Sequence, residues 1–211
     1  MADQLYLSLW FPNFRLQTLP EALVCVLRQF ALVSGQKRVA AASAYPISWN
    51  EVPVWQRVYV IDERSETDES SIIENSVRDA TEQLYDDMAW EFEMKWQLWT
   101  PEAGGGDIGL DRAWKLEPAT VRIIGFGPEF DDASFEQNGH IRVDFGLDSA
   151  FLLEEVDLDP VAAQRVQQNI EKLVAFTLSV EKHCGISSRL LWTESGESIA
   201  QKLVERLQRV N

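Results

Sequence analysis

The sequence predicts an α+β protein in which helices pack on one face of an antiparallel sheet. Residues 90–98 alternate apolar and polar side chains without a break, which is the period of a strand with one buried and one solvated face. Apolar stripes at helical spacing follow N-terminal capping signals over residues 18–34 and 160–182. A chain of 211 residues with 45% hydrophobic residues is large enough to bury a core between such layers.

The first element is a strand over residues 5–11, in which Leu5, Leu7, Leu9 and Phe11 share one face. It ends at Pro12, because proline cannot donate to a β-ladder. A helix follows from Thr18, where a hydroxyl N-cap precedes Pro20 and Glu21, and Gly35 is a natural stop. Its apolar stripe runs from Leu19 to Phe30 at helical spacing.

Strands over residues 39–44 and 54–61 come next, and a second helix begins at the capping box of Ser71 and Glu74. With the strand over residues 90–98, the element order becomes βαββαβ. This order is typical of the ferredoxin-like arrangement, in which two helices cover one face of a four-stranded antiparallel sheet. We predict a ferredoxin-like subdomain over residues 1–100, a fold that hosts many functions and favours none of them.

Three consecutive glycines lie within residues 101–112, which we predict to be a linker or loop because glycine imposes little backbone preference. Residues 113–211 are predicted to form a second α+β subdomain of order ββαβα, which extends the first half or packs on it. Its elements are a hairpin of strands 121–126 and 140–145, a helix over 160–182, a strand over 189–193, and a last helix that begins at Ser195.

The net charge of −15 is shared by both halves of the chain. Such an acidic surface repels phosphate backbones and anionic lipids, so we predict neither a nucleic-acid partner nor a membrane partner. The N-terminus lacks the pattern of a signal peptide, and no apolar stretch approaches the length of a spanning helix. Two cysteines cannot build a disulfide framework, which favours a reducing compartment and a cytoplasmic location.

His140, Arg142 and Asp144 alternate along a predicted strand and should share one face of it. One hypothesis is an acid–base enzyme in which Asp144 orients His140 and Arg142 holds an anionic substrate. The structural alternative is a cross-strand polar network on the solvated face of the hairpin. Whether the protein is an enzyme is left open at this point.

The sequence predicts no metal and no cofactor. His183 and Cys184 are neighbours on a helix and do not face each other, and a partly buried cysteine beside a polar histidine explains them. A zinc site built with Cys25 and His140 as the further ligands has no paired spacing. The acidic segments lack the pattern of a calcium loop, and the glycine-rich segments lack that of a nucleotide site.

Eight tryptophans are more than a chain of this size usually carries. We predict a contact surface at Trp10, Trp55, Tyr59 and Trp99, which fall on the solvated strand face or at strand ends. The second half of the chain or a second copy of the protein could cover an open sheet face. The expected function is a non-enzymatic module that binds a protein partner or a small molecule, with a homodimer as a further possibility and an acid–base enzyme as the alternative.

Overall fold

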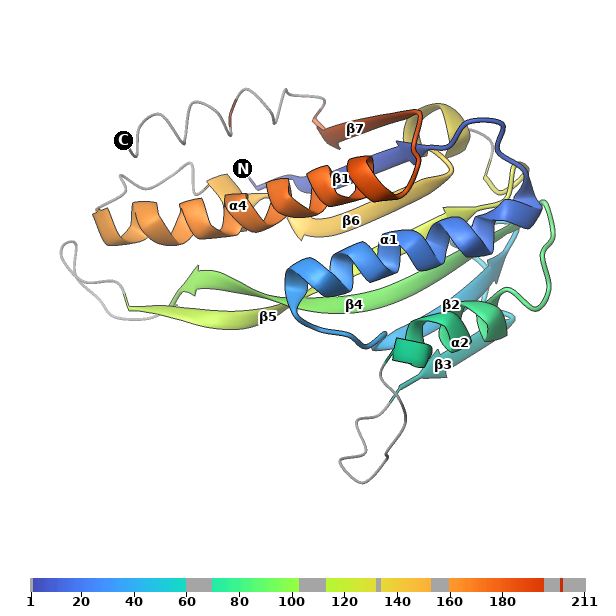
Figure 1. Cartoon of the computed structure of the whole chain (residues 1–211), viewed down its shortest axis with the longest axis horizontal. Coiled ribbons are helices and arrows are strands. Elements are labelled where there is room, and N and C mark those ends of the chain that lie inside the picture. The colour runs from blue at the N-terminus through green and yellow to red at the C-terminus, as the bar shows by residue number, and fades with distance from the viewer. Residues whose placement is uncertain are drawn as a thin grey trace.

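A computed structural model describes residues 2–59, 70–102, 113–131, 134–152, 160–195 and 202. The core of the molecule is a seven-stranded sheet in the order β3-β2-β4-β5-β6-β1-β7, and every neighbouring pair is antiparallel. Helices α1, α2 and α4 lie on the same face of this sheet (Figure 1). The prediction of an α+β protein with helices on one sheet face is confirmed.

The strands are β1 (Gln4–Trp10), β2 (Ala41–Pro46), β3 (Trp55–Val58), β4 (Met88–Pro101), β5 (Trp114–Phe126), β6 (Ile141–Leu147) and β7 (Ser188–Thr193). The helices are α1 (Leu19–Ser34), α2 (Ser70–Ala80), α3 (Ser149–Leu152) and α4 (Pro160–His183). A 3₁₀ turn, Leu16–Thr18, precedes α1, and a π-helical turn, Ser134–Asn138, precedes β6.

Strand β4 confirms the alternation on which the fold prediction was based, and it extends beyond it at both ends. Its even-numbered side chains, from Trp90 to Leu98, are buried in the main core, whereas Glu91 and Glu93 face the other side. The apolar side chains on this side of the sheet supply the surface that the helices cover, and their burial stabilises the fold by about 25 cal/mol for each Å² of apolar area. The opposite side of the sheet, called the open face below, carries the polar residues Glu91 and Glu93 and, at one end, a second buried cluster of Ala89, Ile124, Phe126 and Phe130.

Helix α1 carries the second layer of this core. Leu23, Val26 and Phe30 are fully buried, and Gly35 ends the helix in the left-handed conformation as expected. The Thr18 hydroxyl donates to Arg15 O instead of capping α1, because the 3₁₀ turn comes first. By length and composition Leu16–Ser34 could cross a membrane, which differs from our expectation, but this apolar stripe lies in the core.

The ferredoxin-like arrangement is not confirmed. Strand β1 pairs with β6 and β7, and β4 pairs with β2 and β5, so β5 and β6 stand between β1 and β4. Apolar–polar alternation identifies a strand and its two faces, but it does not identify the neighbouring strands. Both strands that pair with β1 come from the second half of the chain. The subdomain division at residues 1–100 and 113–211 stays a prediction. Within the described residues, both halves contribute strands to one sheet.

Strand β5 is twice as long as the predicted strand over residues 121–126. The tail of β4 pairs with it as far as Pro101 and Trp114, although residues 114–120 have no clear alternation. β5 pairs with β6 only from Arg122 onward, so no strand lies on the β6 side of Pro118 among the described residues. A proline is tolerated there because its missing N–H removes no hydrogen bond to a neighbouring strand. Long-range pairing therefore overrides the local signal.

Several predicted features fall outside the described residues. These are most of the linker (103–112), the acidic loop (62–69) and most of the last helix (196–201 and 203–211). The side chain of Ser71 in the expected capping box is also outside them, while α2 itself begins at Ser70.

The two cysteines differ from the expectation. Cys25 on α1 and Cys184 at the end of α4 form a disulfide across 159 positions of sequence. Their separation hides the pairing from sequence analysis, because no local spacing relates them. The predicted cytoplasmic location, which assumed a reducing compartment, stays a prediction.

Helix α4 also closes the edge of β4 that faces away from β5, along the part of β4 that extends past β2. Beyond Glu93, β4 continues past the last residue paired with β2. The fully buried side chain of Asn169 accepts a hydrogen bond from Trp99 N–H and donates to Trp99 O, both at 2.9 Å. Lys172 donates to Gln97 O at 2.6 Å. Side chains of a helix therefore replace the missing strand.

Candidate functional site

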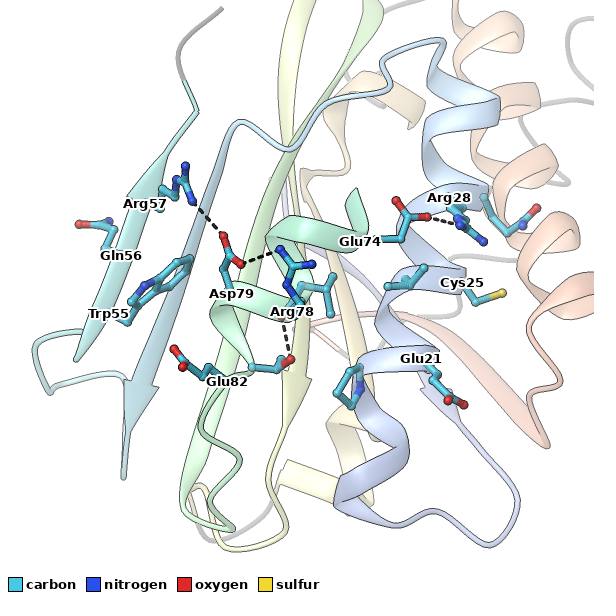
Figure 2. A pocket seen from close by; sticks show the side chains of 15 residues that line it. Glu21, Cys25, Arg28, Trp55, Gln56, Arg57, Glu74, Arg78, Asp79 and Glu82 are labelled. Atoms are coloured by element: carbon cyan, nitrogen blue, oxygen red, sulfur yellow. Dashed lines mark hydrogen bonds and ion pairs between the residues drawn. The ribbon is translucent and has the colours of Figure 1, made fainter. Parts of the chain in front are cut away.

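A groove of about 1,080 Å³ lies between α1, α2 and the edge strand β3 (Figure 2). Its apolar part consists of Pro20 and Val24 from α1, Val77 from α2, and Trp55 from β3. Cavities of several hundred Å³ or more accommodate drug-sized ligands and short peptides. The groove is therefore large enough to receive part of a ligand.

Local sequence explains how α2 comes to border the groove. Ile73, Val77 and Ala80 form a helical stripe that packs against the sheet. The same turns then direct Glu74 and Arg78 away from the sheet, toward α1 and the groove (Figure 2). On β3, period-two alternation directs Trp55 and Arg57 to the helix side, where they meet α2.

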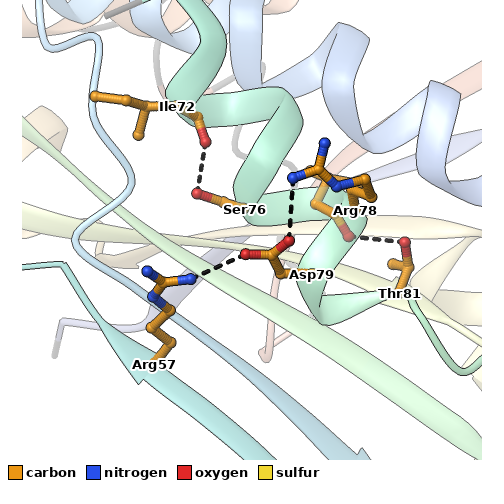
Figure 3. Close-up of polar contacts among 7 residues, drawn as sticks. Arg57, Ile72, Ser76, Arg78, Asp79 and Thr81 are labelled. Atoms are coloured by element: carbon orange, nitrogen blue, oxygen red, sulfur yellow. Dashed lines mark hydrogen bonds and ion pairs between the residues drawn. The ribbon is translucent and has the colours of Figure 1, made fainter. Parts of the chain in front are cut away.

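Three arginines surround the groove, and each is paired with a carboxylate. Arg57 donates to Asp79 at 2.9 Å, and Arg78 donates to the other oxygen of the same carboxylate at 3.4 Å (Figure 3). Arg28 on α1 pairs with Glu74 on α2. The arginine side chains are 56%, 73% and 58% exposed for Arg57, Arg78 and Arg28.

Ion pairs with this much exposure contribute only about 0–1 kcal/mol each to stability. Their structural effect is orientation, because a carboxylate on one side of a guanidinium fixes the plane of the group. More than half of each of these arginine side chains is exposed to solvent. Glu21 and Glu82 add acidic groups to the lining (Figure 2), so the groove offers both signs of charge.

A second polar cluster lies on the open face. Cross-strand register aligns Glu93, Arg122 and Asp144 on β4, β5 and β6. Arg122 lies 3.7 Å from Glu93, 3.7 Å from Asp144 and 3.8 Å from Glu91. Burial raises the pKa of Glu91, and the charge of Arg122 opposes that rise. These contacts form a cross-strand network of the kind that stabilises sheets.

The three predicted catalytic candidates share this face of the sheet, but they interact with different partners. His140, directly before β6, accepts a hydrogen bond from Phe11 N–H at 3.0 Å and stacks on Phe14, with ring centroids 4.0 Å apart. Burial lowers its pKa. Arg142 donates to Asn138, and Asp144 accepts from Gly146 N–H besides contacting Arg122.

The described residues therefore show no hydrogen bond between His140 and Asp144. The acid–base hypothesis stays a prediction. In the part of the chain that the structure describes, no three His, Cys, Asp or Glu side chains come together to hold a metal.

The predicted aromatic contact residues occupy separate places. Trp55 lines the groove, and Tyr59, just after β3, lies beneath Arg57, whose guanidinium carbon is 5.1 Å from the ring centroid. Trp10 donates to Phe135 O on the open face. Trp99 is covered by Arg165 of α4 at 3.7 Å. The structure thus leaves Trp55 and Tyr59 at or beside the same strand, on either side of Arg57, and distributes the other two elsewhere.

Sequence analysis missed Arg28, Glu74, Arg78 and Asp79 as site residues. Arg28 and Glu74 lie far apart in the chain, so their pairing depends on how α1 and α2 pack. An available signal was the alternation of Trp55 and Arg57 on one strand, because these are the residue types that concentrate at binding sites.

Comparison of the chain with protein-family models, with curated proteins and with solved structures finds no match. The function is therefore inferred from the geometry of the groove and of the open face.

Proposed function

We propose that the protein is a non-enzymatic binding module whose α1–α2–β3 groove receives a short segment of a partner protein. The observation that carries the proposal is the combination of Trp55 with Arg28, Arg57 and Arg78 around one hollow. Tryptophan and arginine are enriched among the residues that dominate binding energy at protein interfaces. A groove between two helices and an edge strand suits an extended or helical segment of a partner protein.

The charges of the groove indicate which segment it would favour. A carboxylate of the partner can accept from the free donors of Arg57 and Arg78, whose guanidinium groups Asp79 already orients. An apolar side chain next to that carboxylate can pack on Trp55. We expect the segment to carry an acidic residue beside an apolar one.

The experiment is to pan a displayed random peptide library on the full chain and to measure the selected peptides by fluorescence anisotropy. Arg78→Glu should weaken the selected peptides by about tenfold or more, since the change removes a donor and repels a carboxylate. Arg78 is highly exposed, so the substitution should leave the fold intact.

Lys95→Glu provides the matched control, because Lys95 is exposed on β4 and faces the side of the sheet opposite the groove. It makes the same reversal of charge and should change peptide affinity by less than about twofold. The proposal fails if panning enriches no peptide, or if Arg78→Glu and Lys95→Glu weaken the selected peptides equally.

A further inference from the structure

The outer edge of β3 carries backbone groups that face away from the sheet. β3 ends the sheet and pairs with β2 alone. Tyr59 N–H donates to Ala40 O at 2.9 Å, so the backbone groups of Tyr59 and Arg57 face β2. Because these directions alternate along a strand, Gln56 and Val58 direct their N–H and C=O groups outward. No strand among the described residues pairs with them.

Apolar side chains accumulate at the same edge. Val52, Val54 and Val58 are 80%, 62% and 66% exposed, and all three lie within seven residues. An exposed apolar edge strand is a template for pairing with another chain, and proteins commonly protect such strands with lysines. β3 contains no lysine. This edge is therefore suited to accept a strand.

We propose that β3 pairs antiparallel with β3 of a second copy of this chain, about a two-fold axis at Gln56. The two seven-stranded sheets would then continue into each other. Dimers with two-fold symmetry use the same patch on both copies, so the patch has to be complementary to itself. The sequence of β3 meets that condition.

The register follows from the side chains. With the axis at Gln56, Val58 lies opposite the partner's Val54 on the open face, and the two valines pack together. On the helix side Trp55 lies opposite the partner's Arg57, an arrangement that allows cation–π contact. An axis at Arg57 would instead place two guanidinium groups directly opposite each other, which is unfavourable.

The geometry also sets the strength of the dimer. The N–H group of Val54 donates to Ala44 O within the same chain, so it cannot bond to the partner. Pairing between the two β3 strands therefore depends on the backbone groups of Gln56 and Val58. A small interface of this kind gives a weak dimer. Because each chain carries a net charge of −15, salt should strengthen the association by screening the repulsion between copies.

The dimer does not depend on the proposed peptide, but it would change the surroundings of the groove. Trp55 and Arg57 line the groove and also lie on β3. A paired strand would place the partner's Trp55 and the partner's Arg57 beside this wall. Two grooves would then be neighbours across the axis.

Sedimentation velocity over a micromolar to near-millimolar range, at low and high salt, tests the proposal without any ligand. We expect a monomer–dimer equilibrium that shifts toward dimer at high salt. Val58→Lys should raise the dimer dissociation constant by about tenfold or more, although it reduces the net negative charge. Leu190→Lys is the control, since Leu190 is 49% exposed on β7 at the far end of the sheet.

A cross-link tests the register. Gln56→Cys should give a disulfide-linked dimer under mild oxidation, because residues at the axis face each other at about 5.5 Å between Cα atoms. Val58→Cys should not, since it faces the partner's Val54. The proposal is overturned by a protein that stays monomeric at both salt concentrations, or by a dimer that Val58→Lys and Leu190→Lys weaken equally. A cross-link at Val58→Cys with none at Gln56→Cys would also overturn it.

Discussion

The tail of β4 and the outer edge of β3 each lack a strand on one side among the described residues, and only the first is closed by another element. The tail of β4 extends past β2, and α4 places Asn169 and Lys172 against its backbone. The outer edge of β3 has no such side chain among the described residues, and its residues from Gln56 to Val58 are exposed. Figure 1 shows α4 near the long β4–β5 hairpin and β3 at the margin of the sheet.

The comparison shows that burial decides which edges must be closed. Trp99 is partly buried beside α4, and its N–H and C=O both bond to the fully buried side chain of Asn169, so each of these backbone groups has a protein partner. Backbone groups at the β3 edge can bond to water, and an edge of this kind remains free to accept another strand. The closed edge thus serves stability, and the open edge is available for binding.

The largest expected effect comes from opening the closed edge. Asn169→Leu should lower the free energy of unfolding by about 4 kcal/mol, because it leaves Trp99 N–H, Trp99 O and Ala150 O buried without this partner. Urea denaturation followed by circular dichroism measures the change. The control is Gln164→Leu, an exposed position on the same helix, which should cost less than about 0.5 kcal/mol. Equal losses for the two variants would mean that Asn169 does not close the edge.

The next largest effect is expected at the disulfide that joins α1 to the end of α4. Reduction of the Cys25–Cys184 disulfide should lower the free energy of unfolding by about 3 kcal/mol, since the bond closes a long loop in the unfolded chain. The measurement is urea denaturation with and without a thiol reductant. A variant with Cys25→Ala and Cys184→Ala should show no response to the reductant. A wild-type protein that is equally stable in both conditions would contradict this anchoring role.

A smaller effect is expected at Lys172, which supports the same edge at one point. Lys172→Met should lower the free energy of unfolding by about 1 kcal/mol, because Gln97 O loses its hydrogen-bond donor. Removal of a partly buried charge offsets part of this loss. Burial lowers the pKa of Lys172 below its ordinary value of 10.5. The folded state therefore binds this proton less tightly than the unfolded state, and wild-type stability should rise relative to the variant as pH approaches 10.5. If the difference in stability between the wild type and the variant became smaller as pH rises toward 10.5, the role assigned to Lys172 would be wrong.

The smallest effect on stability is expected at the open edge. Val58→Lys should change the free energy of unfolding by less than about 0.5 kcal/mol, since Val58 is 66% exposed and buries little area. Measurement at low protein concentration keeps association from contributing. A loss comparable to that of Asn169→Leu would show that β3 is part of the folded core and would end the distinction between the two edges.

The candidate site was less predictable than the fold. Residue type alone pointed to Trp55, which lines the groove, and to Tyr59, which is not among its lining residues. The groove depends on pairs such as Arg28 with Glu74, which the packing of α1 on α2 creates. The histidine hypothesis assumed that alternation along β6 brings His140 and Asp144 into contact. Residues two or four apart on a strand share a face, yet their partners come from neighbouring strands and loops that the local pattern does not reveal.

By itself the sequence determined that β4 is a strand with its tryptophans inward, that α1 ends at Gly35, and that helices cover one side of the sheet. These features follow from local periodicity and capping, which depend on residues a few positions apart. Tertiary structure alone decided that β1 lies between β6 and β7, that Cys25 meets Cys184, and that Asn169 closes the edge at Trp99. Each of these joins residues separated by tens of positions, where the pattern of one segment carries no information about its partner.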